Sequence, residues 1–512
     1  MSPDVPLVLD DLRIEAKRLH RAYAAREVWA VQRLKQHPPR HATDDLKRAD
    51  FLHVIAQETG FASWPKLKLA AETVGLDRAA KQQRLKIALF HGQTALVETL
   101  LADTPDLADG LFGLECAFYR RDAVAAALAR DPGLATRLAG PRRPILHLSF
   151  SRWIKAHPEL ESDMLAVAEL LLAHGADVND GYAFAEGDDH LLSALYGAIG
   201  HADNMVLGRW LLDHGADPND GESLYHATEL GHHEGLSMLL QAGADPKGTN
   251  ALLRAMDFHD HTAVEMLLAH GAKADDYNDA EVGGEQPWVV PALHQAARRG
   301  CDRRMVDLLL DAGADPARSY QGASAYAYAR ALGNPAVWQA IEARGVQPSL
   351  SPEETLLARA AEGQDSPGQY IDPDKLPAAY RLIVNEILHL PDRLPHLRRL
   401  MALGLPWDAP NGEGVPPVQF AGWQGLPEVM AYFLSLRPDL SHVNRYGGTL
   451  LSTILHGAEN APDRDKRDHV TCLEHALHHG VALPRHTISQ VAREDIRDVL
   501  EDWADRHPGQ VV

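Results

Sequence analysis

"PALHQAARRGCDRRMVDLLLDAGADP" (residues 291–316) is the stretch that decides the fold, because it contains two short helical patterns separated by a glycine. Its first half, 292–299, is rich in alanine and ends at Gly300, which tolerates the positive φ that a helix end requires. Its second half places leucines before Gly313, and Pro316 prevents the helix from continuing. The stretch therefore predicts a helix, a tight turn, a second helix and a connecting finger.

The second half of this stretch recurs along the chain, which indicates an array of similar units. Neither short helix can bury its apolar face alone, so consecutive units must stack on one another. The recurrences are "LLLAHGADVND" (170–180), "LLDHGADPND" (211–220), "LLQAGADP" (239–246) and "LLAHGAKAD" (267–275).

The combined phrase resembles the ankyrin repeat, whose pattern is TPLHxAA, then G, then V-x-x-LL, then GADP. Five units between about 141 and 348 match this pattern. The resemblance implies an all-α fold, an ankyrin-repeat solenoid of stacked helix-turn-helix units with short β-turn fingers. Degenerate ankyrin-like repeats are expected at 81–140 and 383–512. Residues 349–382 are expected to form a linker or a degenerate repeat.

Residues 1–80 do not match the repeat and are predicted to form a helical cap that covers one end of the stack. Within them, "GFASWPKLK" (60–68) resembles a segment often found ahead of the repeats in bacterial ankyrin repeat proteins. There Gly60 is expected to end one helix and Ser63 to cap the next. Trp64 is expected to fill the seam between this cap and the first repeat.

The composition is that of a globular chain, with 45% hydrophobic residues, 24% charged residues and a formal net charge of −21. That charge repels phosphate backbones and argues against nucleic-acid binding. No run of about 18 apolar residues is present, so no membrane-spanning helix is expected. The three cysteines are far apart, which favours a reducing, cytoplasmic compartment. A secreted effector is the least favoured alternative.

Two connections between units are longer than the others and carry aromatic side chains beside acidic ones, at 181–192 and 277–290. Insertions in repeat arrays map to one edge and often bind partners. The favoured interpretation is that both are longer solvated connections whose aromatics pack back onto neighbouring repeats, and partner binding is the alternative. The candidate partner-binding residues are Tyr182, Phe184, Asp188, Asp189, Tyr277, Asp279, Glu281 and Trp288.

No catalytic signature such as a Gly-x-Ser-x-Gly elbow, a phosphate loop or a Cys-x-x-Cys pair occurs in the sequence. The protein is therefore predicted not to be an enzyme and to need no cofactor. Histidines and aspartates near 187–190 and 257–261 leave one alternative, a metal- or small-ligand-binding protein or an enzyme. We assign no metal ligand there, because residues adjacent in sequence do not converge on one ion unless a loop folds back.

The second of these clusters, "DFHDH", fits the turn of a repeat. Counting twelve residues back from Gly271 reaches His259, so helices are predicted at 250–258 and 262–270 with His259 in place of glycine. Cys301 also follows a turn glycine, and nearby arginines would lower the pKa of its thiol. A small turn residue is the favoured interpretation of Cys301.

The leading functional expectation is a non-catalytic scaffold that binds another protein. The concave surface of fingers and first helices would make the contact. Because the chain is acidic, a partner with a basic patch is expected, and the association should weaken with salt. No nucleic acid, membrane or cofactor is expected as a partner.

Overall fold

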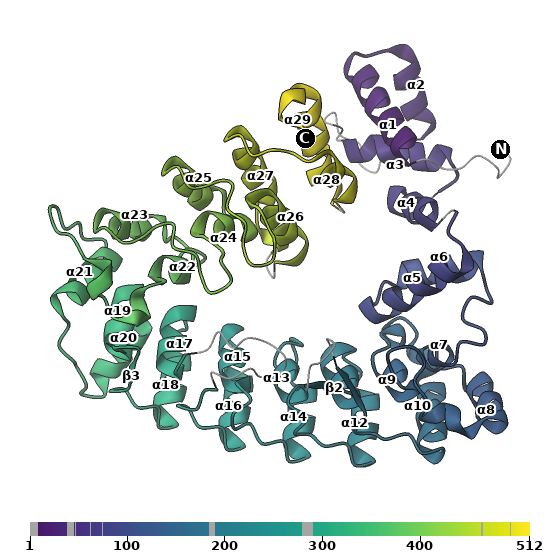
Figure 1. Cartoon of the computed structure of the whole chain (residues 1–512), viewed down its shortest axis with the longest axis horizontal. Helices are drawn as coiled ribbons and strands as arrows, with labels where there is room; N and C mark the ends of the chain where they lie inside the picture. Colours follow the sequence, from purple (N-terminus) through teal and green to yellow (C-terminus); the bar gives the residue numbers. More distant parts are fainter. Residues whose placement is uncertain are drawn as a thin grey trace. The chain divides into compact units, whose positions relative to one another are not determined.

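The structure, a computed structural model, describes residues 9–37, 46, 48–61, 63–73, 75–183, 190–278, 290–461, 464–491 and 493–512. The chain divides into two compact units, Met1–Ala244 and Asp245–Val512 (Figure 1). In the described residues both units consist of short helices joined by turns, and each contains one small β-hairpin. The predicted all-α fold of stacked helix pairs is confirmed.

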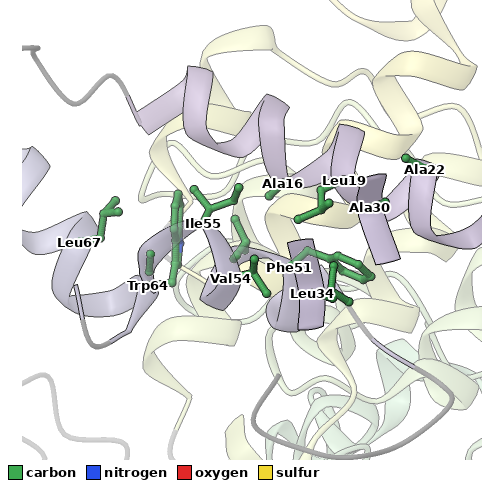
Figure 2. Close-up of a cluster of buried hydrophobic side chains, with 12 residues drawn as sticks. Ala16, Leu19, Ala22, Ala30, Leu34, Phe51, Val54, Ile55, Trp64 and Leu67 are labelled. Atoms are coloured by element: carbon green, nitrogen blue, oxygen red, sulfur yellow. The ribbon is translucent and has the colours of Figure 1, made fainter. Parts of the chain in front are cut away.

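The first unit opens with four helices, α1 (Leu9–Ala24), α2 (Val28–Gln36), α3 (Arg48–Glu58) and α4 (Trp64–Thr73). Figure 2 shows their shared core, in which Phe51 and Trp64 lie among aliphatic side chains. Gly60 has a φ of 89° and separates α3 from α4, as expected. Trp64 is 3% exposed and contributes to the core of this amino-terminal bundle itself.

The remainder of the first unit is a series of helix pairs. They are α5 (Arg78–His91) with α6 (Thr94–Asp103), α7 (Phe112–Ala117) with α8 (Arg121–Arg130), α9 (Pro144–Ser149) with α10 (Glu161–Ala173), α11 (Ala194–Tyr196) with α12 (Met205–Asp213), and α13 (Ser223–Ala227) with α14 (Glu234–Gln241). Short 3-10 helices lie at η1 (Pro132–Ala135), η2 (Trp153–Lys155) and η3 (Pro158–Leu160), and α11 continues into a π-helical turn, η4 (Gly197–His201). Strands β1 (Gly181–Ala183) and β2 (Leu191–Ser193) pair antiparallel in the finger before α11, with Tyr182 opposite Leu192.

The second unit continues the series. Its helices are α15 (Ala251–Asp257) with α16 (His261–Ala269), α17 (Ala292–Arg299) with α18 (Arg303–Asp311), α19 (Ala325–Leu332) with α20 (Pro335–Ala343), α21 (Pro352–Ala361), α22 (Ile383–Ile387) with α23 (Leu394–Ala402), α24 (Pro417–Trp423) with α25 (Pro427–Ser435), α26 (Leu450–Asn460) with α27 (His469–His478), α28 (Arg485–Gln490) and α29 (Glu494–Arg506). Its 3-10 helices are η5 (Pro373–Lys375), η6 (Ala378–Tyr380), η7 (Arg464–Lys466) and η8 (Pro508–Gln510). Strands β3 (Ser319–Tyr320) and β4 (Ala323–Ser324) form the finger before α19.

Stacking of like helices builds the core of the second unit. First helices α15, α17 and α19 pack on one another in order, and second helices α16, α18 and α20 do the same. The turn inside the α17–α18 pair follows the sequence closely. Gly300 has a φ of 66°, and the Asp302 side chain accepts a hydrogen bond from the Met305 N–H at 2.9 Å, which caps α18.

Most residues with positive φ lie at the turns that the repeat spacing predicts, but one turn differs. His259 has a φ of 54° between α15 and α16, as the count from Gly271 predicts. The corresponding turn before α12 is formed by Asp203, which has a φ of 49°, although Gly200 lies 15 residues before Gly215 and would suit the repeat spacing. Gly200 instead lies inside η4, where its small size serves side-chain packing.

The predicted linker, 349–382, lies within the second unit. There α21 packs on α19, and the side chains of Ile371 and Tyr380 are buried. The division between the two compact units falls instead at Ala244, inside the best-matching repeats. The five predicted segments otherwise stay a prediction.

Candidate functional site

Four rings form a continuous series along the first-helix side of the first unit, and we call this series the first ring ladder. Phe90 lies near the end of α5, Phe150 follows α9, Tyr196 lies on α11 and His226 lies on α13. The successive ring centroids are 5.9, 5.8 and 4.9 Å apart. These separations are typical of favourable ring pairs. All except Phe150 are only partly buried.

Two glycines let the first ring ladder lie close to the backbone. A Cβ atom at Gly197 would stand 2.5 Å from the Phe150 ring, and one at Gly200 would stand 2.6 Å from the Tyr196 ring. A side chain at either position would therefore push a ring out of line. The two glycines of "GAIG" (197–200) therefore make room for the rings, and they do not form the turn between the helices.

Tyr182, one of the predicted partner-binding residues, joins this series through β1. Its ring centroid is 5.3 Å from that of Phe150, and its hydroxyl accepts a hydrogen bond from Arg142 Nη2 at 2.6 Å. The side chain is half-buried, so it packs back onto the preceding unit while keeping an exposed part. The predicted residues Phe184, Asp188 and Asp189 lie outside the described residues.

A buried carboxylate ends the first ring ladder. The side chain of Glu222 contacts His190, which precedes β2, and lies 2.9 Å from Nε2 of His226. Nδ1 of His226 is 3.0 Å from Glu229. Burial alone would lower the pKa of His226, but the two carboxylates raise it to about 9, so this imidazole is cationic at neutral pH. Residues 187–189 of the candidate ligand-binding edge lie outside the described residues.

A second series of rings runs across the second unit, and we call it the second ring ladder. It connects Tyr277, Tyr320, His294, Tyr328 and Tyr380, whose successive ring centroids are 6.0, 5.8, 5.4 and 6.0 Å apart. The predicted residue Tyr277 lies at its finger end, where the Arg318 guanidinium carbon is 5.3 Å from its ring. The other predicted residues of that finger, Asp279, Glu281 and Trp288, lie outside the described residues.

The second ring ladder is covered by the chain itself. Residues 376–393, which we call the crossing segment, place Tyr380 on Tyr328, and both side chains are nearly fully buried, at 1% and 4% exposure. Nε of Arg298, on α17, lies 3.4 Å from a carboxylate oxygen of Glu386 on α22. The first-helix side of α17 and α19 is therefore an internal contact at these residues.

Further contacts hold the crossing segment in place. Arg393 donates a hydrogen bond to the Gly333 carbonyl at 3.1 Å, and the Ala379 N–H donates to the Gln321 carbonyl at 3.3 Å. The Tyr380 hydroxyl donates to Glu354 at 2.8 Å. Sequence reasoning missed this arrangement. The one available signal was the apolar run "LIVNEILHL" (382–390), which lacks a turn glycine.

The side chains of the His/Asp cluster at 257–261 form hydrogen bonds within the α15–α16 pair and to the neighbouring α17–α18 pair. Asp257 accepts a hydrogen bond from Arg299 at 2.7 Å, and Asp260 accepts one from the Ala263 N–H, which caps α16. His261 donates to Asp302 at 2.9 Å. Within the described residues, no group of three or more His, Cys, Asp or Glu side chains is arranged to hold a metal ion.

Cys301 is a buried side chain, 1% exposed. Burial, together with the nearby carboxylates of Asp257 and Asp302, raises the pKa of its thiol to about 12. The thiol is therefore protonated at neutral pH, and the nearby arginines do not activate it. This agrees with its interpretation as a small turn residue.

The α17–α18 pair and the chain that follows it carry the repeat phrase most completely. Residues 291–319 match the family model of the ankyrin repeat. Ankyrin repeats generally mediate binding between proteins. No curated protein sequence matches the chain. No helix in the described part of the chain is long and apolar enough to cross a membrane.

Several solved ankyrin repeat structures are similar to part of the chain. The human ASB11 ankyrin repeat domain is 21% identical, covers 46% of this chain and 99% of its own, and gives a TM-score of 0.33. An ankyrin repeat domain from Acinetobacter baumannii AYE is 22% identical, covers 38% of this chain and 100% of its own, and gives 0.30. The ankyrin repeat domain of Bcl-3 is 21% identical, covers 46% and 98%, and gives 0.34.

Proposed function

We propose that this chain is a non-catalytic ankyrin-repeat scaffold that binds another protein through its fingers and first helices. The observation that carries the proposal is the first ring ladder, whose rings at Phe90, Tyr196 and His226 are only partly buried. Rigid aromatic side chains supply contact area at low entropic cost, and they dominate the energetics of many protein interfaces. In the second unit the first-helix side is covered by the chain itself around Tyr328. In the first unit the equivalent side stays partly exposed, and we propose it as the contact surface.

The finger residue Tyr182 is part of this proposed surface. It is fixed by Arg142 and Phe150, so it is already held in place before a partner arrives. The net charge of −21 supports long-range attraction toward a partner that carries basic surface, with an association that weakens as salt rises. A cytoplasmic location, suggested by the sparse cysteines, is part of the same proposal.

Affinity purification from extracts of the source organism, followed by mass spectrometry, tests the surface. The double variant Tyr196→Ala/Tyr225→Ala removes two partly buried rings of α11 and α13. Val206→Ala is the matched control, because Val206 is an exposed apolar residue on a second helix, α12. We expect a partner captured by the wild type and by Val206→Ala to be lost with the double variant. Circular dichroism must show that all three proteins remain folded at the temperature of capture. Retention of the same partner by the double variant would sink the proposal for this surface.

A further inference from the structure

Arg142 occupies an unusual position among the rings of the first unit. Its guanidinium carbon lies 4.0 Å from the ring centroid of Tyr182, 4.7 Å from that of Phe90 and 4.9 Å from that of Phe150. Three ring faces therefore surround one cation, and each contributes a cation–π attraction. Within the described residues, a single hydrogen bond to a side chain, from Nη2 to the Tyr182 hydroxyl, fixes the guanidinium.

No carboxylate within the described residues pairs with Arg142. Its Nε is buried without a hydrogen-bond partner, and burial lowers the pKa of this side chain. The neighbouring Arg143 contrasts with it, because Arg143 lies 2.7 Å from Asp180. Arg137 likewise lies 2.9 Å from Asp131. In a chain with 71 acidic and 50 basic residues, a half-buried arginine without an acidic partner among the described residues needs an explanation.

Other cations gather near Arg142 and make its surroundings electropositive. Burial first, and then the charges of Arg142 and Lys86, lower the pKa of His147 to about 4. Burial and the charges of Arg152 and Arg142 likewise lower the pKa of His201 to about 4. These imidazoles are therefore neutral at pH 7, and the fixed cations lie where an added carboxylate would be attracted.

A guanidinium binds carboxylates best, because its parallel N–H groups match the two carboxylate oxygens. The partly buried rings of Tyr182 and Tyr196 lie beside it and suit apolar groups that flank a carboxylate in a peptide. A free inorganic anion would make no use of those rings. We propose that Arg142 anchors a surface that recognises carboxylate side chains on an acidic segment of the partner protein. This inference rests on the proposed function and assigns one acidic segment, which meets Arg142, to a partner whose surface is otherwise basic.

Fluorescence anisotropy with the full chain tests the proposal. The probe is a short labelled peptide of alternating Glu and Leu, and its neutral counterpart replaces each Glu by Gln. We expect the acidic peptide to bind at least about tenfold more tightly than the neutral one. Arg142→Met should remove at least about tenfold of that affinity, since it deletes the charge-assisted hydrogen bonds. The matched control Arg137→Met removes an exposed, already paired cation and should change the affinity by less than about twofold.

Folding must be separated from binding. Methionine keeps an apolar stem among the rings, which offsets part of the lost cation–π attraction, so Arg142→Met should remain folded with a modestly lower unfolding temperature than the wild type. Arg142→Lys keeps the charge but loses the planar guanidinium, and an affinity between those of wild type and Arg142→Met is expected. If Arg142→Met fails to fold, the Lys variant still tests the inference.

Three results would overturn this inference. They are equal affinity for the acidic and neutral peptides, binding that ignores Arg142→Met in folded protein, and full displacement by millimolar inorganic phosphate, which would indicate a free-anion site. The broader proposal fails separately, because it requires loss of a captured partner in the Tyr196→Ala/Tyr225→Ala variant. A chain that loses its partner in that variant but ignores acidic peptides would refute only the role of Arg142.

Discussion

Each ring ladder contains a histidine on a first helix, yet the two histidines differ in charge. His226 lies beside the buried carboxylate of Glu222, and its pKa rises to about 9. Burial lowers the pKa of His294 to about 4, and its Nε2 donates to the Ala323 carbonyl. The imidazoles of α13 and α17 therefore differ in charge and exposure because the connections that adjoin them differ.

The two ring ladders also differ in how far other parts of the chain cover their rings. The crossing segment places Tyr380 over Tyr328 of α19, and both side chains are buried. The second ring ladder is therefore part of a core there. In the first unit Tyr196 keeps an exposed part and lies over Gly200. One kind of side chain therefore stabilises the fold in one unit and remains partly accessible in the other.

The largest expected effect tests this difference in coverage. Tyr328→Ala should cost about 3–5 kcal/mol of unfolding free energy, because it leaves a cavity beneath the crossing segment. Tyr196→Ala should cost about 1–2 kcal/mol, because its ring is only partly removed from water. Urea unfolding followed by circular dichroism measures both losses, and hydrogen exchange assigns each to its unit.

Tyr328→Phe is the control for the first of these variants. It keeps the ring volume, so we expect a loss of less than about 1.5 kcal/mol. Equal costs for Tyr196→Ala and Tyr328→Ala would mean that the two ladders do not differ in coverage.

A smaller effect is expected from the ion pair that holds the crossing segment. Glu386→Ala leaves the guanidinium of Arg298, which is 6% exposed, without this carboxylate. Breaking such a pair should cost about 3 kcal/mol. We expect faster hydrogen exchange across residues 376–393 and unchanged exchange across α11 and α13.

Glu386→Gln keeps the shape of the side chain and serves as its control. It should cost less than Glu386→Ala, because the amide keeps the polar oxygen beside the guanidinium and removes only the negative charge. Unchanged exchange of the crossing segment in Glu386→Ala would show that this pair does not hold it.

The paired histidines should give pH dependences of opposite sign. The raised pKa of His226 contributes stability that is present below about pH 6.5 and is lost as the pH rises toward about 9. The lowered pKa of His294 contributes stability that is present above about pH 6.5 and is lost as the pH falls toward about 4. Each contribution is at most about 3 kcal/mol.

His226→Gln should therefore cost most near pH 6 and little above pH 9, and His294→Gln should cost more at pH 7.5 than at pH 4.5. Urea midpoints measured across this range test both signs. The exposed His91 supplies a control for the loss of an imidazole outside the helix-pair core, and His91→Gln should cost little at pH 7. Slopes of the same sign for the two ladder histidines would contradict the assigned environments.

The repeat phrase predicted most helix pairs because helix ends are encoded locally. The leucines, Gly300 and Gly313 of one unit are enough to place α17 and α18. The spacing does not identify the role of Gly200, because glycine serves both in left-handed turns and in close packing against a ring.

The candidate surface was only partly predictable, because its contacts join distant residues. Tyr182 was recognised as an aromatic in a long finger, but nothing in the sequence links it to Arg142, 40 residues earlier. Phe90 and Phe150 belong to degenerate and variable parts of the pattern, so no repeated position marks them as neighbours. The crossing segment was missed for the same reason, since its cover over Tyr328 is a tertiary contact.

A third histidine, His259, gives the smallest expected effect. It is exposed, and its φ of 54° is a conformation that glycine adopts more readily than a branched side chain. His259→Gly relieves about 1 kcal/mol of backbone strain and adds a similar entropic cost in the unfolded chain. We therefore expect a change between zero and about 1 kcal/mol of stabilisation in urea unfolding.

Tyr119 provides the matched control, because its φ is 59° but its side chain is 2% exposed and its hydroxyl donates to the Ser151 carbonyl at 3.2 Å. Tyr119→Gly should cost at least about 3 kcal/mol, since the lost packing outweighs any relief of strain. A loss of that size in His259→Gly would show that the imidazole of His259 has a specific partner. His259 would then represent a third kind of histidine environment beside those of His226 and His294. In it, the side-chain contacts of a turn residue would outweigh the strain of its positive φ.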